Sequence, residues 1–230
     1  MATVIDLHVH TTRGSSDSNL SPEDMVTESR RLGVTGLCIT EHNNLWDRHE
    51  FNAFAYKHDL LLIRGVEVDT DMGHVLVFGM EDYVSGISRI AELRRVVDRA
   101  KGFMITAHPF RGIHSPGGLR RPYLYRDTPT MPDTVEEASE HAVFGYADAV
   151  EVANGNTIDS ENAFARGVAE HLRMRGTGGS DAHSVHGLGR CFTVFEDDVR
   201  SEEEFVEALR HGRYHAAYGL RTGAVRAFAG

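Results

Sequence analysis

Cysteine is scarce in this sequence, and long apolar runs are missing from it. Cys38 and Cys191 are the only cysteines among 230 residues, and both lie in short apolar runs, as buried free thiols in a reducing compartment do. No apolar stretch approaches the ~18 residues that a membrane-spanning helix needs. The N-terminal residues also lack the basic and apolar regions of a signal peptide. We therefore expect a soluble cytoplasmic protein with no membrane partner.

Positive charge is also in deficit. Lys and Arg number 24 against 34 Asp and Glu, so the net charge is −10 with neutral histidine. Because contacts to phosphate supply most of the affinity for duplex nucleic acid, this balance argues against a duplex nucleic-acid partner. Hydrophobic residues make up 41% and charged residues 25% of the chain, which excludes collagen-like and disordered classes. Histidine, by contrast, is abundant, with 14 copies.

Short apolar runs alternate with longer amphipathic ones along the whole chain. The runs predict strands at 4–9, 34–40, 60–68, 73–80, 103–109, 148–155, 177–183, 191–195 and 214–219. The amphipathic segments predict helices at 21–33, 46–58, 87–102, 134–143, 159–176 and 201–212, with a long loop at 110–132. This alternation predicts an α/β fold with a mainly parallel sheet. Because no linker or repeat interrupts it, we expect one domain spanning 1–230.

Ionisable side chains recur where the predicted strands end. They are Asp6, His8, His10, Glu41, His42, Glu67, His108, Glu151, Asp181 and His183, whereas His74 opens its strand and breaks the pattern. In a barrel the C-terminal ends of parallel strands converge on one face, and that face holds the active site. An open sheet would instead spread these groups along an edge. The convergence therefore favours a barrel.

The spacing of these residues indicates a metal site. Residues i and i+2 of a strand share a face, so His8 and His10 point the same way, as do Asp181 and His183. Imidazole and carboxylate ligands together suit ions such as Zn, Mn and Fe. A lone strand histidine is more often an ordinary core or surface residue. Burying so many ionisable groups together, however, would cost several kcal/mol each without a compensating ion.

Seven segments in order resemble the motifs of one known family. DLHVHTTRGSSDS, ITEHN, GVE, GHVLVFG, TAHPFR, EVANG and GGSDAHS are similar to the successive motifs of the PHP (polymerase and histidinol phosphatase) superfamily of metal-dependent phosphoesterases. The resemblance runs from about residue 4 to about residue 220. It implies a distorted (β/α)7 barrel with two or three divalent metal ions, Zn, Mn or Fe, at the C-terminal ends of the strands.

The resemblance also implies a role for individual residues. It assigns a first metal to His8, His10, Glu67 and Asp181, a second to Glu67, His74 and His108, and a third to Asp17, His42 and His183. Catalytic roles would fall to Glu67, Asp181 and His183, while Asp6, Glu41 and Glu151 would orient the ligands from behind. Two positions depart from the family: Glu41 replaces the usual Asp, and Ser18 replaces a Gly after Asp17.

The expected reaction is hydrolysis of a small phosphomonoester or a nucleotide-type phosphoester by a metal-bound hydroxide. Arg111, Arg13 and Arg190 follow the motifs and are expected to hold the substrate phosphate, because guanidinium binds phosphate bidentately. Tyr123 and Tyr125 lie in the long loop, where they would pack or stack on a ring. Three alternatives remain open: a hydrolase of amides, carbamates or carboxylic esters, a 3′-5′ nuclease, and a non-catalytic metal-binding regulatory domain.

Overall fold

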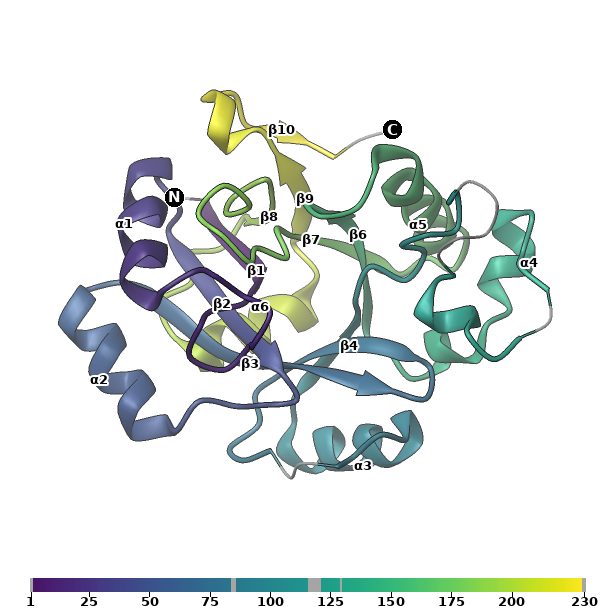
Figure 1. Cartoon of the computed structure of the whole chain (residues 1–230), viewed down its shortest axis with the longest axis horizontal. Coiled ribbons are helices and arrows are strands. Elements are labelled where there is room, and N and C mark those ends of the chain that lie inside the picture. Colours follow the sequence, from purple (N-terminus) through teal and green to yellow (C-terminus); the bar gives the residue numbers. More distant parts are fainter. Residues whose placement is uncertain (1, 84–85, 116–120, 129, 229–230) are drawn as a thin grey trace.

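A computed structural model describes residues 2–83, 86–115, 121–128 and 130–228, and its strands form a ten-stranded sheet in the order β10-β9-β8-β1-β2-β3-β4-β5-β6-β7 (Figure 1). The strands are β1 (Thr3–Val9), β2 (Gly36–His42), β3 (Leu61–Thr70), β4 (Gly73–Phe78), β5 (Phe103–Thr106), β6 (Ala149–Asn154), β7 (Arg175–Gly179), β8 (Cys191–Phe195), β9 (Tyr214–Tyr218) and β10 (Arg226–Ala227). The helices are α1 (Pro22–Leu32), α2 (Arg48–His58), α3 (Ile90–Ala100), α4 (Val135–Ser139), α5 (Asp159–His171) and α6 (Glu202–His211).

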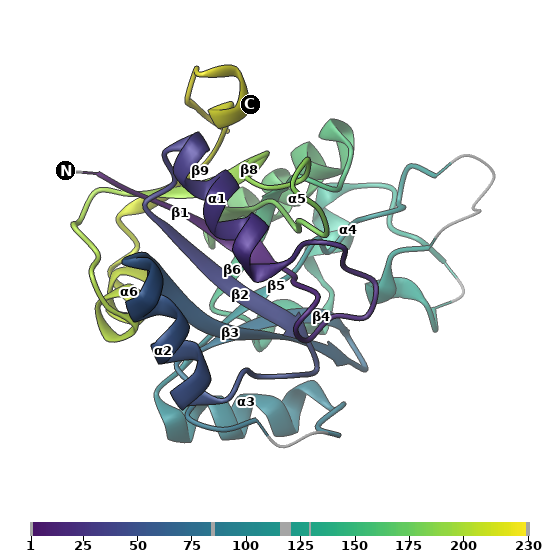
Figure 2. The same ribbon diagram turned by 60° about the vertical axis from the view of Figure 1, so that its left-hand side comes forward.

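The sheet curls into a half-barrel (Figure 2), and the chain after β7, at one end of the strand order, comes to lie beside β1. Beyond β7 the chain returns to β1, where Val9 and Ala182 form a parallel bridge and the His10 amide donates to the Ala182 carbonyl at 3.0 Å. The predicted α/β class is therefore confirmed. A regular seven-fold β/α repeat is not what the sheet shows, because β8, β9 and β10 extend it from β1 as antiparallel strands.

The expectation of a mainly parallel sheet is wrong, because five of the nine strand pairings among the described residues are antiparallel, two of them made by β4. This strand runs antiparallel to both β3 and β5, whereas β1–β2–β3 and β5–β6–β7 are parallel. The reason is the short connection: β3 ends at Thr70 and β4 begins at Gly73. A parallel neighbour needs a crossover of a dozen or more residues, so a connection this tight permits only a hairpin. Gly73 has a φ of 88°, which suits glycine at this turn.

Local signals placed most helices correctly. The Ser21 side chain accepts a hydrogen bond from the Asp24 amide at the start of α1, and Gly33 ends that helix with a φ of 73°. The helix predicted at 134–143 is shorter: α4 stops at Ser139, and the His141 side chain then accepts from the Val143 amide and starts a separate 3₁₀ turn.

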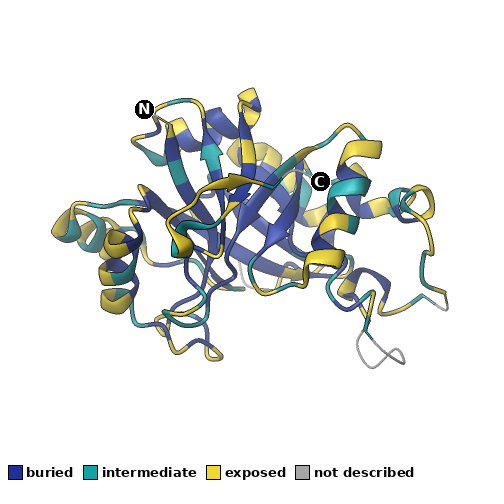
Figure 3. Ribbon diagram, turned by 90° about the horizontal axis from the view of Figure 1, so that it is seen from above, coloured by how far each residue is buried: buried dark blue, intermediate teal, exposed yellow. Residues whose placement is uncertain are grey.

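One apolar cluster fills the end of the curled sheet away from the first residues of β4, and two others lie between the sheet and the helices. Phe205 of α6 packs edge-on against Phe78, the last residue of β4, with ring centroids 5.2 Å apart, and also contacts Phe195 of β8. The strands are buried and the helices around them expose their outer faces (Figure 3). Within the described residues, no helix has the length and apolarity needed to cross a bilayer. The cytoplasmic location and the single domain stay predictions.

Candidate metal centre

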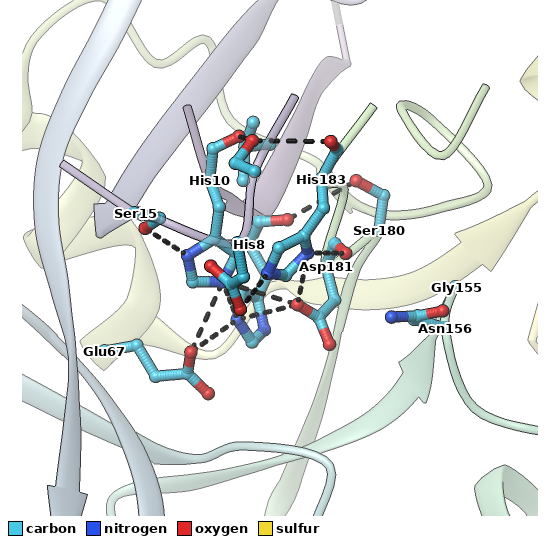
Figure 4. A network of polar contacts seen from close by, with 12 residues as sticks. His8, His10, Ser15, Glu67, Gly155, Asn156, Ser180, Asp181 and His183 are labelled. Atoms are coloured by element: carbon cyan, nitrogen blue, oxygen red, sulfur yellow. Dashed lines mark hydrogen bonds and ion pairs between the residues drawn. The ribbon is translucent and has the colours of Figure 1, made fainter. Parts of the chain in front are cut away.

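The predicted metal ligands come together at the other end of the curled sheet. His8 lies in β1 and His10 directly after it, while His108 follows β5. His74, the exception to the strand-end pattern, joins them because β4 is antiparallel, so its first residues lie where β3 finishes. The side chains brought together are His8, His10, Asp17, His42, Glu67, His74, His108, Asp181 and His183, several of which are drawn in Figure 4.

Glu67 stands at the middle of this cluster and is almost fully buried. Its Oε1 lies 2.8 Å from His74 Nδ1 and 2.9 Å from His108 Nε2. Its Oε2 faces three more ring nitrogens: His42 Nδ1 at 2.9 Å, His10 Nε2 at 3.3 Å and His8 Nε2 at 3.4 Å. The Glu67 carboxylate therefore lies close to five of the six histidines that the resemblance implies as metal ligands. His183 is the exception.

Asp181 and Asp17 complete the remaining sets. Asp181 Oδ1 lies 3.5 Å from His8 Nε2 and 3.3 Å from His10 Nε2. Asp17 Oδ2 lies 3.3 Å from Nε2 of both His42 and His183. Ligand atoms that could share an ion fall into three groups: His8 with His10 and Asp181, His8 with Glu67 and His108, and His10 with His42 and His183. The grouping is close to the three sets that the resemblance implies.

Asp181 and His183 meet the cluster by a different route from the one expected. The predicted strand at 177–183 ends at Gly179, and Asp181 has a φ of 52°, so these two residues do not share a strand face. Asp6 holds the segment instead: its Oδ1 accepts from the Ser180 amide at 2.7 Å and its Oδ2 from the Gly189 amide at 3.1 Å. Burial raises the pKa of the Asp6 carboxyl to about 6, although these hydrogen bonds act to lower it.

Hydrogen bonds behind the cluster fix the rings of His8 and His10. Glu151 Oε1 lies 3.0 Å from His8 Nδ1, so this nitrogen donates to a carboxylate. His10 Nδ1 lies 3.1 Å from Ser15 Oγ, and that hydroxyl already donates to Glu41 Oε2 at 2.5 Å, so it can only accept from His10. Both Nδ1 atoms therefore carry the proton, and the lone pairs on Nε2 point into the cluster.

This arrangement fits a bound cation. The Nε2 atoms of His8 and His10 lie 3.0 Å apart, and with both Nδ1 atoms protonated neither can donate to the other. Two lone pairs at this distance repel each other unless a positive charge lies between them. Glu67 Oε2 is also buried, and it faces three ring nitrogens without a well-aligned hydrogen bond to any of them. The imidazole and carboxylate set suits divalent Zn, Mn or Fe.

In the absence of a metal ion, a proton on the His8 ring would supply this positive charge, because the neighbouring carboxylates favour its protonated form. Burial would raise the pKa of Glu67 and of Asp181, but the surrounding histidines, His8 first, hold both pKa values well below the ordinary range. Burial would lower the pKa of His8, but the carboxylates, Asp181 first, raise it well above its usual value. Burial, reinforced by Arg111, lowers the pKa of His108 to about 4. The carboxylates thus stay charged and attract cations.

Glu41, the residue that departs from the family pattern, supports the loop after β1 through its hydrogen bonds. It accepts from the Thr11 amide at 3.0 Å, from Thr11 Oγ1 at 2.5 Å and from Trp46 Nε1 at 3.3 Å. With Ser15 as a fourth donor, both carboxylate oxygens are engaged. Ser15 was missed from the sequence, because a serine five residues after His10 gives no local signal that its hydroxyl reaches that ring.

Of the three arginines expected at the substrate phosphate, only Arg111 reaches the cluster. Its Nη2 contacts Asp181 Oδ2 and donates to Asn154 Oδ1 at 2.8 Å, and its Nε donates to Thr157 Oγ1 at 3.1 Å.

The other two arginines turn away. Arg13 is half-exposed, pairs with Glu50 of α2 and lies over the Trp46 ring, with 5.7 Å between its guanidinium carbon and the ring centroid. Arg190 donates to the carbonyls of His186 at 3.2 Å and Gly155 at 3.4 Å. The loops that carry them are held by these contacts, which the sequence does not reveal.

The two loop tyrosines differ. Tyr125 is buried in the core, whereas Tyr123 is half-exposed and stacks on His74 with ring centroids 4.5 Å apart. Arg126 holds this segment against the β3–β4 hairpin by donating to the Thr70 carbonyl at 2.6 Å.

Comparison with known proteins adds a family. The sequence profile of the PHP domain matches residues 6–147, and a profile described as PHP-associated matches residues 159–214. DNA polymerase III subunit alpha from Buchnera aphidicola subsp. Schizaphis graminum is 39% identical over 64 residues, which are 28% of this chain and 6% of that subunit.

Solved structures share the fold. A two-domain protein from Bacteroides vulgatus, described as containing a predicted PHP-like metal-dependent phosphoesterase, aligns with a TM-score of 0.67 and 22% identity over 95% of this chain and 65% of its own. Endonuclease Q in complex with a 27-mer duplex that carries an abasic lesion aligns with a TM-score of 0.60 and 17% identity over 92% of this chain and 57% of its own. The chain spans less than two thirds of each of these relatives.

Proposed function

The chain belongs to the PHP domain family, and on this premise we propose that it hydrolyses a small phosphomonoester or a nucleotide-type phosphoester with two or three bound divalent ions. The observation that carries the proposal is the position of Glu67, whose carboxylate lies within 3.4 Å of five histidine rings. A family of metal-dependent hydrolases needs such a centre. Arg111 beside it supplies a guanidinium for a phosphate.

The proposed ligands are the three sets named from the family motifs. His8, His10 and Asp181 would hold one ion with Glu67, His74 and His108 a second with Glu67, and Asp17, His42 and His183 a third. Divalent ions bound there supply Lewis-acid activation of water and charge neutralisation of phosphoryl oxygens.

The protein's own groups position the reacting parts. Arg111 is oriented by Asn154 and Thr157, so its guanidinium is fixed before substrate arrives. It would bind non-bridging phosphoryl oxygens and stabilise the charge they gain in the transition state. His183 Nδ1 lies 3.0 Å from the Asp181 carbonyl and donates to it, which leaves Nε2 of this ring facing Asp17. Residues 181–183 thereby place the Asp181 carboxylate and the His183 imidazole, with its orientation fixed, in the cluster.

A substrate panel tests this proposal. Protein stripped of metal and reloaded with Mn, Zn or Fe is assayed on p-nitrophenyl phosphate, bis-p-nitrophenyl phosphate, nucleotides, p-nitrophenyl acetate, an amide, and single-stranded and duplex oligonucleotides. We expect metal-dependent release of phosphate from the small esters, and none from the His8→Ala variant.

Other outcomes would select the alternatives. Faster hydrolysis of the acetate or the amide would replace the phosphoester proposal with an ester or amide hydrolase. Faster cleavage of oligonucleotides would favour a nuclease, and cleavage of duplex would contradict the predicted absence of a duplex partner. Metal binding without turnover on any substrate would favour a regulatory metal domain.

A further inference from the structure

Hydrogen bonds from behind the metal centre orient several of its histidine rings. The Nδ1 atoms of His8, His10 and His183 each donate to an oxygen atom that is not one of the proposed ligand atoms. A bond of this kind fixes the ring of a ligating histidine and thereby raises its affinity for a metal ion. Among the described residues, the ring of His74 has no such bond.

His74 presents Nδ1 to the cluster, 2.8 Å from Glu67 Oε1. Its other ring nitrogen, Nε2, lies 3.9 Å from Oδ1 of the half-exposed Asp69, which is too far for a hydrogen bond. The same carboxylate oxygen also faces Arg126 Nη1 at 3.5 Å. The orientation of the His74 ring therefore depends on what packs against it.

Tyr123 covers one face of the His74 ring. The two rings are stacked, with 4.5 Å between their centroids and 23° between their planes. The tyrosine side chain is half-exposed, and within the part of the chain that the structure describes its hydroxyl makes no hydrogen bond. The contact to His74 is therefore made by the aromatic ring and not by the hydroxyl group.

The residues that follow this tyrosine fix its position. Leu124 and Tyr125 are buried, and the Leu124 carbonyl accepts a hydrogen bond from His141 Nε2 at 3.0 Å. The Leu124 side chain also packs against Gly73, the residue before His74, because a Cβ atom at Gly73 would lie 3.0 Å from Leu124 Cδ1. The stacking ring and the proposed ligand are thus anchored to the same end of β4.

The charge of a bound ion would strengthen this stacking. A cation on His74 Nδ1 withdraws electron density from the imidazole, whereas the face of the Tyr123 ring carries negative potential. The two rings therefore attract each other more strongly when the ion is bound than when it is absent. For this reason the contact adds to the affinity for the ion and not only to the stability of the fold.

We propose that Tyr123 is a positioning residue of the metal centre. Its ring holds the His74 imidazole with Nδ1 directed toward the ion that His74 would share with Glu67 and His108, and it thereby raises the affinity for that ion. The inference rests on the proposed function, because it names a residue that orients one ligand of the metal centre used there.

Metal titrations of the metal-stripped protein test this role, with folding checked by circular dichroism. Calorimetry with Zn and Mn compares the wild type with Tyr123→Leu, which removes the aromatic ring, and with Tyr123→Phe, which keeps it. Tyr123→Leu should weaken one metal-binding step about two- to tenfold, the range that an aromatic pair supplies, and Tyr123→Phe should retain the wild-type affinity. Tyr56→Leu is the matched control and should change nothing, because Tyr56 of α2 is 91% exposed and its ring makes no aromatic contact among the described residues.

Two further readouts separate positioning from a merely structural role. The visible absorption of cobalt-loaded protein depends on the geometry of the ligands, so it should change in Tyr123→Leu and be restored in Tyr123→Phe. In a His74→Ala background, Tyr123→Leu should cause no further loss of affinity for the remaining ions, because the ring through which it acts is gone. A further loss in that background would overturn the inference.

Other results also contradict the role of Tyr123. Unchanged metal affinity in Tyr123→Leu, or equal losses in the leucine and phenylalanine variants, would overturn it. A raised KM for a phosphoester with unchanged metal affinity would do the same, since it would mean that the tyrosine contacts the substrate. Metal binding without turnover of any phosphoester, with the difference between the two variants intact, would contradict the proposed function and leave the positioning role standing. A wild type that binds no metal would overturn both.

Discussion

Ser15 is expected to control the metal affinity of the cluster through the ring of His10. Its hydroxyl accepts from His10 Nδ1 at 3.1 Å and from the His42 amide at 3.2 Å, and it donates to Glu41 Oε2 at 2.5 Å. In Ser15→Ala, His10 Nδ1 loses its acceptor, so the ring is free to rotate or to move its proton to Nε2. A protonated Nε2 cannot bind a metal ion.

The magnitude follows from the bonds that are lost. A hydrogen bond that orients a ligating histidine is worth roughly 10- to 100-fold in metal affinity, which is about 1.4–2.8 kcal/mol at ~1.4 kcal/mol per decade. Glu41 keeps its bonds to Thr11 and Trp46, so the loop should stay in place and the fold should survive. We therefore expect a loss of metal affinity by one to two decades with a small change in thermal stability.

Competition with a chromophoric chelator measures the affinity for Zn and Mn, and circular dichroism measures the melting temperature. Ser18→Ala is the matched control: Ser18 Oγ donates to the His10 carbonyl at 2.9 Å and touches the same residue without reaching its ring. This control should lose stability and keep its metal affinity. Wild-type metal affinity in Ser15→Ala, or an equal loss in Ser18→Ala, would refute the proposed orientation of the His10 ring.

Three further predictions concern turnover and stability. Asp181→Ala should abolish turnover while far-ultraviolet circular dichroism shows an intact fold, because the apolar clusters that stabilise the fold do not include Asp181; wild-type kcat with full metal content would place the site elsewhere. Arg111→Ala should lower kcat/KM on p-nitrophenyl phosphate by about 10- to 150-fold and leave p-nitrophenyl acetate unaffected, whereas Arg13→Ala should change neither, since Arg13 pairs with Glu50. Removal of metal by a chelator should lower the melting temperature, because a ligand present at 100 times its Kd stabilises the folded state by about 2.7 kcal/mol; an unchanged melting temperature would count against a buried metal centre.

The sequence carried most of the information on the ligands because their chemistry and their order along the chain are both specific. His8 and His10 could be placed on one face from strand geometry alone, and the structure puts their Nε2 atoms 3.0 Å apart. Helix ends such as Ser21 and Gly33 are local signals, so they too could be predicted.

The antiparallel β4 explains why His74 reaches the cluster, and this direction could have been predicted, because only four residues separate the strands expected at 60–68 and 73–80.

Contacts between distant segments were beyond sequence reasoning. Asp181 has a φ of 52°, and the amides of Ser180 before it and Gly189 after it donate to Asp6, more than 170 residues earlier in the chain. The sequence led us to expect Arg13 at the substrate phosphate, because nothing in the local sequence indicates its ion pair with Glu50.

Metal content per chain tests the central claim most directly. Protein purified without chelator and protein reloaded with Mn, Zn or Fe are measured by elemental analysis, and so is the Glu67→Gln variant. This substitution keeps the shape of a side chain that belongs to two of the three proposed ligand sets. We expect two or three divalent ions per wild-type chain and a loss of at least one in the variant. A wild type that holds no metal and takes up none would contradict the account, and so would full occupancy in Glu67→Gln.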